Sequence, residues 1–458
     1  MIELACINAG VGHVAMAKKL TSVLGVDLGS QYIKVAEIKM QGRQPSITAL
    51  GIAQTPPGSV DHIGVHDPVS VSAILKQLCA SSGATSPDVV LSIAGQGSVL
   101  VRTLEVPVMN DTELKQHMEW EITRNIPFPE NTVSSDFKPF PPDTPGDQNM
   151  DVVMAISPQS AVDSLLDLVK KAGKKPAALD VEPLGLARSL SMSYPVEYQG
   201  KTVCLVEVGH KTTAINIYRD GKLLMPRQVP IGGEMFTRAI ADGLGISFEE
   251  AEQLKHTRGA IPQDAATAAP SFGGFGQTQT FGETQSFAAY NPFADSGEAV
   301  PAYNPFSDDA ASPAPADDAA EAVSSEPVSE LPVSEEPVAA IEPAAALAPA
   351  AASPLNEEEL RVYNAMAGVV DEFLAEVRRS IDYYRSKGGD VDQILMCGGG
   401  SKLRGLPEFI NGLIGVPTIM MDPTKGITVA AKKLDPSMLD ESRPDFAVAI
   451  GNGLHIFF

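Results

Sequence analysis

A run of polar residues interrupts an apolar segment near the start of the chain, in residues 23–39, VLGVDLGSQYIKVAEIK. The apolar residues on either side of DLGS predict two β-strands, so the polar group lies at the turn between them. Such a turn can aim backbone N–H groups at an anion, because glycine permits close approach of the backbone. Lys34 follows Asp27 by seven residues. A plain hairpin turn explains the same residues, since D-x-G turns are common in sheets.

Two further glycine-bearing turns follow, EVGHKTT at residues 207–213 and CGGGSKLRGL at residues 397–406. Each turn alone is a weak signal, and the third lacks the GxxxxGK spacing of a Walker loop. The ordered set of three resembles the actin-like nucleotide-binding fold. In that fold two hairpins hold the phosphates from opposite domains, and a glycine-rich turn supports the adenosine.

Length and charge restrict the classes of protein to consider. At 458 residues the chain is too long for one compact core, so two or more domains are expected. Asp and Glu (57) far outnumber Lys and Arg (34), and this excess argues against nucleic acid or an anionic membrane as the main partner. Residues 261–355 contain fourteen acidic residues and no Lys, Arg or His, so the rest of the chain is only mildly acidic.

Cysteine spacing and hydropathy predict a soluble protein of a reducing cytoplasm. Cys6, Cys79, Cys204 and Cys397 form no CxxC pair and have no nearby His cluster, which argues against zinc or disulfide frameworks. Lys18-Lys19 follows the apolar start of the chain instead of preceding it, so a secretory signal is not expected. No uncharged apolar run reaches about eighteen residues, so no membrane insertion is expected.

A change of composition separates residues 260–355 from the rest. This segment is rich in Ala, Pro, Ser, Glu and Gly, and it repeats YNPF and EPVSE-like motifs. Its apolar content is too low to offset the entropy of ordering, so we predict a disordered acidic insert. The YNPF repeats are either docking motifs for a partner or part of a tolerated spacer.

Outside the insert the pattern is mixed α/β. Helices are predicted around residues 69–80, 111–126, 158–173, 234–245 and 248–257. Asp111 is the expected cap of the second helix. A second hairpin turns at Asp220-Gly221. Asn356 and Glu359 form a capping-box pattern at the start of a long helix that ends at residues 388–389.

The chain resembles the PilM family, the actin-like proteins of type IV pilus assembly. The resemblance lies in EWEITRNIPFPENTVSSDF, ALDVEPLGLARSL, QVPIGGEMFTRAIADGLGISFEEAEQLK and CGGGSKLRGLPEFI, and it extends from Ser22 to the end except for the insert. It implies an actin-like (ribonuclease H-like) two-domain α/β fold with an extra FtsA-type subdomain. The implied division is a tail at 1–22, domain I at 23–192 with the extra subdomain at about 86–155, domain II at 193–425 with the insert, and a return to domain I at 426–458.

The resemblance also implies ATP and Mg²⁺ as ligands. Asp27 would hold Mg²⁺ through water, with Glu207 as the second residue at the metal, and Lys34 would reach the phosphates. Glu252 and Lys255 would clamp the ribose, although a surface ion pair at i, i+3 explains that spacing equally well. The full set implied to bind the nucleotide is Asp27, Gly29, Ser30, Lys34, Glu207, Gly209, Thr212, Thr213, Gly233, Glu252, Lys255, Gly398, Gly399, Gly400, Ser401 and Leu403.

Two departures from the actin pattern argue against efficient hydrolysis, and no catalytic residue is identified. Glu207 stands where many relatives of the fold have Asp, and Ala214 stands where actin has its catalytic His. His210 is expected to be a solvated turn residue. Met118 and Trp120 are expected in the core, and Cys397 is expected to be a buried filler.

The resemblance implies a cytoplasmic, ATP-binding scaffold that associates peripherally with the inner membrane. It would bind the N-terminal cytoplasmic tail of a PilN-like membrane protein near the extra subdomain, contact other platform proteins and form a homo-oligomer or ring. One alternative is an ATPase or small-molecule kinase, which needs a carboxylate base in the cleft; the sequence identifies none. Another is an FtsA-like division filament. It is disfavoured because the chain stops at AIGNGLHIFF, without a membrane-binding amphipathic helix.

Overall fold

The computed structural model describes residues 20–42, 44–95, 97–129, 132–142, 146–262 and 355–457. The acidic insert with its YNPF repeats, apart from its two ends, and most of the N-terminal tail lie outside these residues. The predicted mixed α/β architecture is confirmed, with strands and helices in alternation through most of the chain. Within the described ranges, no helix combines the length and apolarity needed to cross a membrane.

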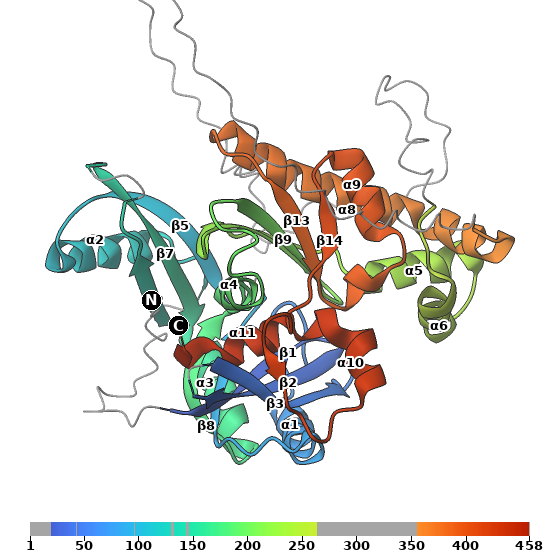
Figure 1. Cartoon of the computed structure of the whole chain (residues 1–458), viewed down its shortest axis with the longest axis horizontal. Coiled ribbons are helices and arrows are strands. Elements are labelled where there is room, and N and C mark those ends of the chain that lie inside the picture. The colour runs from blue at the N-terminus through green and yellow to red at the C-terminus, as the bar shows by residue number, and fades with distance from the viewer. Residues whose placement is uncertain are drawn as a thin grey trace, which may run out of the picture. The chain divides into compact units, whose positions relative to one another are not determined.

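The first sheet carries the DLGS turn and has the strand order β15-β3-β2-β1-β4-β8 (Figure 1). β1, β2 and β3 are antiparallel, whereas β4 and β8 run parallel to β1. The register of β1 and β2 pairs Asp27 with Lys34, so their side chains lie on the same face of the sheet. The strands of this sheet are β1 (Ser22–Leu28), β2 (Tyr32–Gln41), β3 (Gln44–Gln54), β4 (Asp88–Ile93), β8 (Lys175–Val181) and β15 (Thr428–Val429).

Helices cover both faces of the first sheet. α1 (Pro68–Ser82) and α3 (Gln159–Lys171) pack together on one face, and α4 (Glu182–Ser193) and α11 (Ala447–Gly453) pack on the other. α11 approaches α4 so closely that a Cβ at Gly451 would lie 1.9 Å from the Gly185 carbonyl oxygen. Only glycine fits this crossing, which fixes the position of α4 and therefore of the residues at its start.

A small subdomain is inserted in the chain between β4 and β8, which are neighbours in the first sheet. It consists of β5 (Leu100–Pro107), α2 (Asp111–Arg124), β6 (Val133–Pro139) and β7 (Asn149–Pro158), with the sheet order β5-β7-β6. Asn110, and not the predicted Asp111, caps α2, because its side chain accepts from the N–H groups of Thr112 and Glu113.

Met118 on α2 is fully buried as predicted, but Trp120 is 56% exposed, so the expectation of a core position for Trp120 was wrong. Two residues along a helix turn by about 200°, which places Trp120 on the opposite face from Met118. Its ring instead lies 5.0 Å from the Arg124 guanidinium.

The second sheet carries the EVGHKTT turn and has the order β11-β10-β9-β13-β14, with β12 paired to β10. The predicted turn at Asp220-Gly221 is confirmed, since both residues have positive φ, 49° and 79°, as a type I′ turn requires. The strands of this sheet are β9 (Thr202–Val208), β10 (Thr213–Arg219), β11 (Lys222–Met225), β12 (Gln228–Val229), β13 (Gln393–Cys397) and β14 (Thr418–Met420). Cys397 is fully buried in this sheet, as predicted.

Helices α5 (Gly233–Leu244), α6 (Phe248–Arg258), α8 (Glu357–Ser386) and α9 (Leu406–Ile414) pack around the second sheet. The predicted capping box of α8 is confirmed, with Asn356 and Glu359 bonded reciprocally. On the other face, α4 contacts β10 and β11, so α4 lies between the two sheets. The remaining elements are α10 (Pro436–Ser442) and the 3₁₀ turns Gly399–Lys402, Arg443–Phe446 and His455–Phe457.

Candidate functional site

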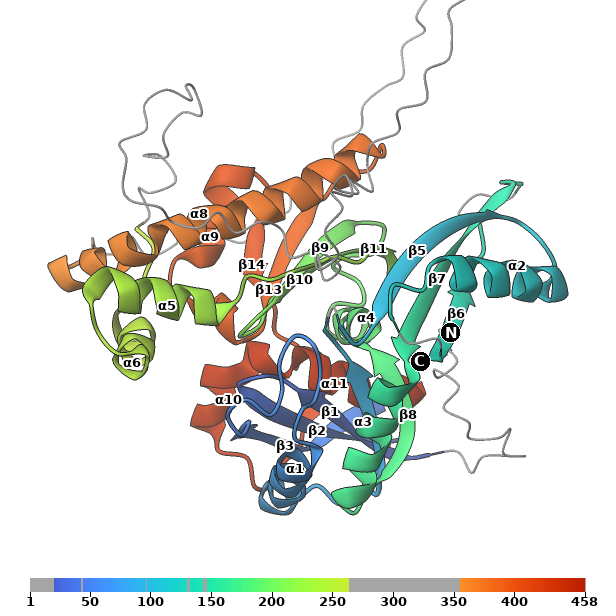
Figure 2. The ribbon, with the colours of Figure 1, turned by 180° about the vertical axis from the view of Figure 1, so that it is seen from behind.

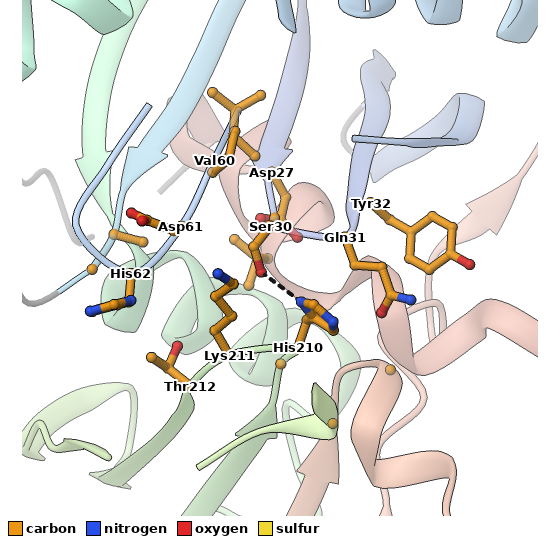
Figure 3. A pocket seen from close by; sticks show the side chains of 18 of the residues that line it. Asp27, Ser30, Gln31, Tyr32, Val60, Asp61, His62, His210, Lys211 and Thr212 are labelled. Carbon is orange, nitrogen blue, oxygen red and sulfur yellow. Dashed lines mark hydrogen bonds between the residues drawn. The ribbon is translucent and has the colours of Figure 1, made fainter. Parts of the chain in front are cut away.

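The DLGS and EVGHKTT turns face one cavity of about 760 Å³ between the two sheets (Figure 3). The glycine-rich segment after β13 and the helix α6 complete its wall. Most residues that the sequence assigned to a ligand line this cavity. They are Asp27, Gly29, Ser30, Lys34, Glu207, Gly209, Thr212, Gly233, Glu252, Lys255, Gly399, Gly400 and Leu403.

The two turns have the same backbone hydrogen bond. The N–H of Gly29 donates to the Tyr32 carbonyl oxygen at 3.1 Å, and that of Gly209 donates to the Thr212 carbonyl oxygen at 3.0 Å. An added Cβ would lie 2.7 Å from the acceptor at Gly29 and 2.9 Å at Gly209. Glycine is therefore required at both positions, and the bare turns present their backbone to the cavity.

Lys34 supplies a positive charge at the base of the first turn. Its Nζ lies 2.8 Å from Oδ2 of Asp27, and both side chains are largely buried. Burial lowers the pKa of Lys34, but the charges of Asp27 and Glu207 outweigh it and raise the pKa above its ordinary value. Lys34 is therefore charged at neutral pH and balances part of a carboxylate-rich cavity floor.

Glu182, which the sequence analysis missed, also faces the cavity. Burial and then the charge of Asp27 raise the pKa of Glu182 to about 7. Burial and then Glu182 raise the pKa of Glu207 well above its ordinary value. Among the described residues, the buried oxygens Glu182 Oε1 and Asp445 Oδ1 have no hydrogen-bond partner. The other oxygen of Asp445 is paired with Lys402 at 2.7 Å, so each residue has one buried oxygen that a cation or a water could satisfy.

These carboxylates fit Mg²⁺ held partly by water. In the described parts of the chain, no group of three or more His, Cys, Asp or Glu side chains is arranged to hold a metal by itself. Mg²⁺ is commonly bound by one or two carboxylates, with waters and substrate phosphates completing its shell. Asp27 and Glu207 are suited to that mode, and the floor would be electrostatically unfavourable for phosphate without a cation.

Glu252 and Lys255 lie at the cavity and not on the open surface, with side chains 18% and 13% exposed. The Nζ of Lys255 is 2.7 Å from Oε2 of Glu252 and donates to the Gly233 carbonyl at 3.0 Å. Burial opposes the charge of both groups. It lowers the pKa of Lys255, whereas hydrogen bonds from His256, Lys255 and Thr237 lower the pKa of Glu252. Glu252 is therefore ionised at neutral pH, and hydrogen bonds to Gly233, Thr237 and Glu252 fix the amino group of Lys255 in place.

The family of the type IV pilus assembly protein PilM matches residues 25–268, more than half of the chain. The chain belongs to the PilM family. The family of the cell division protein FtsA also matches, over residues 204–451.

Three relatives show the range of similarity to known proteins. The cell division protein FtsA of Bacillus subtilis (strain 168) is 35% identical over 130 residues, which are 28% of this chain and 28% of that protein's length. A structure of a PilM-PilN type IV pilus biogenesis complex is 23% identical, covers 96% of this chain and 100% of that one, and has a TM-score of 0.68. MreB5 of Spiroplasma citri bound to ADP is 12% identical over 95% of each chain, with a TM-score of 0.41. The predicted actin-like fold is thus confirmed for this PilM-family chain.

Three residues that the PilM resemblance assigned to the ligand do not line the cavity. Thr213 is fully buried, and its hydroxyl donates to the Ile231 carbonyl at 2.7 Å. Ser401 is 1% exposed, and its hydroxyl donates to the Gly398 carbonyl at 2.6 Å. Gly398 packs against Glu207 and Val208 with φ of 83°. These residues therefore support the turns from behind.

His210 is half-buried at the second turn, in place of the solvated position expected for it. Its Nδ1 lies 3.2 Å from Oγ of Ser30 on the first turn (Figure 3). Burial is the main cause that lowers the pKa of His210. Gln31 makes a second contact across the cavity, from Nε2 to Oε1 of Glu252 at 3.3 Å. The two turns of this PilM-family protein therefore touch through side chains as well as facing one cavity.

The sequence analysis also missed the cavity wall formed by the loop before α1. Val60, Asp61 and His62 lie on this wall, opposite Lys211 and Thr212 (Figure 3). A contact of 2.8 Å between Nε2 of His66 and Oδ1 of Asp61 braces the loop. No signal in the sequence indicated this loop. Glu182 did carry a signal, because it directly follows β8, which runs parallel to β4. Ligands of open α/β sheets bind at the carboxyl ends of such strands.

Proposed function

We propose that this chain is an ATP-binding scaffold of the type IV pilus inner-membrane assembly platform. The observation that carries the proposal is the convergence of two glycine turns, from separate sheets, on one cavity. The N–H groups around Gly29, Ser30, Gly209 and Thr212 would bind the phosphates, with Mg²⁺ beside Asp27 and Glu207. Glu252 and Lys255 would hold the ribose, and Gly399, Gly400 and Leu403 would lie against the adenine.

Bound ATP would favour a closed arrangement of the two domains that carry the turns, because it would bind that arrangement preferentially. At a ligand concentration about 100 times Kd this stabilisation is worth about 2.7 kcal/mol. That free energy is enough to change which surface is presented to a partner. The domain boundaries implied by the resemblance, with domain I at 23–192 and domain II at 193–425, place one turn in each half.

The proposed partner is the N-terminal cytoplasmic tail of a PilN-like membrane protein. The structure of a PilM-PilN complex supports this choice of partner. The small subdomain is the proposed location, because Val108 and Trp120 expose 50% and 56% of their area there. The protein would then be cytoplasmic and associate with the inner membrane through this partner, other platform proteins and its own copies in a ring.

The proposed function is tested with the full chain and a synthetic peptide of the N-terminal tail of a co-encoded PilN-like protein. We expect the peptide to bind in fluorescence anisotropy, and Trp120→Ala to weaken binding about 10-fold or more, as for an interface hot spot. Val196→Ala is the matched control, because Val196 is 76% exposed and lies outside the small subdomain. Absence of peptide binding by the wild-type chain would contradict the scaffold proposal.

Slow ATP hydrolysis is a second candidate, favoured by the unpaired carboxylate of Glu182. A carboxylate with a pKa of about 7 can orient a water molecule and accept its proton. A phosphate-release assay on the wild type and on Glu182→Gln distinguishes the candidates. Turnover that falls about 100-fold in Glu182→Gln, with ATP affinity kept within about threefold, supports hydrolysis. Equal rates in the wild type and in Glu182→Gln would exclude Glu182 as the residue that activates water.

A further inference from the structure

The small subdomain contacts the second sheet through β11, which lies beside β5 (Figure 2). The Nζ of Lys222 on β11 is 2.6 Å from Oδ2 of Asp151 on β7. The hydroxyl of Thr103 on β5 donates to the Leu224 carbonyl of β11 at 3.0 Å. Lys222 is 12% exposed and Asp151 is 36% exposed, so this is a partly desolvated pair at the edge of an interface.

β11 is one arm of the hairpin that grows out of the second turn of the cavity. β10 begins at Thr213, immediately after the Gly209 turn, and runs to Arg219, a length of about 23 Å at 3.3 Å per residue. The tight turn at Asp220-Gly221 then returns the chain through β11. The cavity turn and the contact with the small subdomain are therefore carried by one short hairpin. Its register shifts between Ile217 and Tyr218, whereas β10 is paired with β9 without a break from Thr213 to Arg219.

Other contacts hold this hairpin to the surrounding structure as a stiff unit. The buried hydroxyl of Tyr218 on β10 donates to the Pro183 carbonyl at 2.7 Å, next to Glu182. Leu223 on β11 is 1% exposed and belongs to the same core as Val153 and Ala155 of β7. Because β10 is paired residue by residue with β9 along its whole length, it can transmit a displacement of the cavity turn to β11.

We propose that the β10–β11 hairpin couples the cavity to the small subdomain through the Lys222–Asp151 ion pair and the Thr103–Leu224 hydrogen bond. The inference rests on the proposed function, because nucleotide must bind at the second turn to displace it. Filling the cavity changes the position of β11, and the two polar contacts carry that change to β5 and β7. By linkage, a ligand on the small subdomain changes the affinity for nucleotide by the same factor.

Hydrogen exchange with the Mg²⁺ complex of AMPPNP, a non-hydrolysable ATP analogue, tests this coupling in the full chain. In the wild type we expect slower exchange at the cavity turns, residues 27–34 and 207–213. We also expect a change of about fivefold or more in β5 and β7. In the double variant Thr103→Val/Lys222→Met, the turns should keep their protection while the change in β5 and β7 disappears. Lys170→Met, at a 61% exposed ion pair of α3, is the matched control and should behave as the wild type.

A charge exchange, Asp151→Lys/Lys222→Asp, provides a second test that does not depend on the fold of the double variant. It should restore most of the response of β5 and β7 that either single substitution removes. If the turns are protected but exchange in β5 and β7 of the wild type does not change, the coupling is wrong. It is also wrong if that change persists in the double variant. Either result leaves the proposed function intact. Absence of protection at the turns in the wild type overturns the nucleotide site and the coupling with it.

Discussion

Gly209→Ala is expected to weaken the binding of Mg²⁺·ATP about 30-fold, which corresponds to about 2 kcal/mol. The added Cβ would lie 2.9 Å from the Thr212 carbonyl oxygen, a contact that real Cβ atoms do not make. The turn must therefore open, and its N–H groups lose their common direction toward the cavity. The Gly209 carbonyl also accepts from Gly233 at 2.9 Å, so the displacement spreads into the start of α5. Isothermal titration calorimetry measures the affinity directly.

Gly368→Ala is the matched control for this substitution. Gly368 lies within α8, and an added Cβ there meets no atom within 4 Å. We expect unchanged affinity and a gain in stability of about 0.5–1 kcal/mol, since alanine is favoured over glycine within a helix. Equal affinity for ATP in Gly209→Ala and in the wild type would contradict the assignment of this turn to phosphate binding.

Lys34→Met is expected to lower the free energy of unfolding by about 3 kcal/mol at pH 7.5 and to weaken ATP binding about 100-fold. The substitution leaves the largely buried Asp27 without its partner, next to Glu182 and Glu207. It also removes the cation that would face the phosphates. Chemical denaturation measures the first effect and calorimetric titration the second. Lys170→Met, which breaks a solvent-exposed pair, should change neither quantity by more than a few tenths of a kcal/mol.

The pH dependence of this variant follows from the pKa shifts. The pKa of Lys34 is raised in the folded state, so its contribution is complete below the unfolded value of about 10.4 and is lost only as the pH rises through the folded value. The wild type therefore keeps this contribution at pH 7.5. The defect in Lys34→Met should shrink at pH 5.5, because the pKa of Glu182 is about 7 with Lys34 present and higher without it, so Glu182 is then protonated in the variant. A defect that grows at pH 5.5 would exclude carboxylate repulsion as its cause.

The elements that carry the turns could be predicted because their signals are local. Apolar strands on both sides of DLGS predict the first hairpin, and Asp220-Gly221 predicts the turn between β10 and β11 from the backbone conformation that it requires. The capping box at Asn356 and Glu359 likewise depends on residues a single helical turn apart. Such features need no knowledge of the tertiary structure.

The rest of the cavity depends on which distant residues the fold brings together. Glu182 and Asp445 are 263 positions apart in the numbering, and their orphaned oxygens become apparent only beside Asp27 and Glu207. Thr213 and Ser401 stand within glycine-rich motifs, but strand alternation and the 3₁₀ turn point their hydroxyls to backbone carbonyls behind the cavity. The exposure of Trp120 depends on helical phase, which a count of apolar residues does not resolve.

A crystal structure of the full chain with Mg²⁺ and AMPPNP is the most direct test of the central claim. We predict that the phosphates lie between the Gly29 and Gly209 turns, with the metal beside Asp27 and the ribose against Glu252 and Lys255. A nucleotide bound elsewhere, or an empty cavity at saturating concentrations of both ligands, would contradict the account.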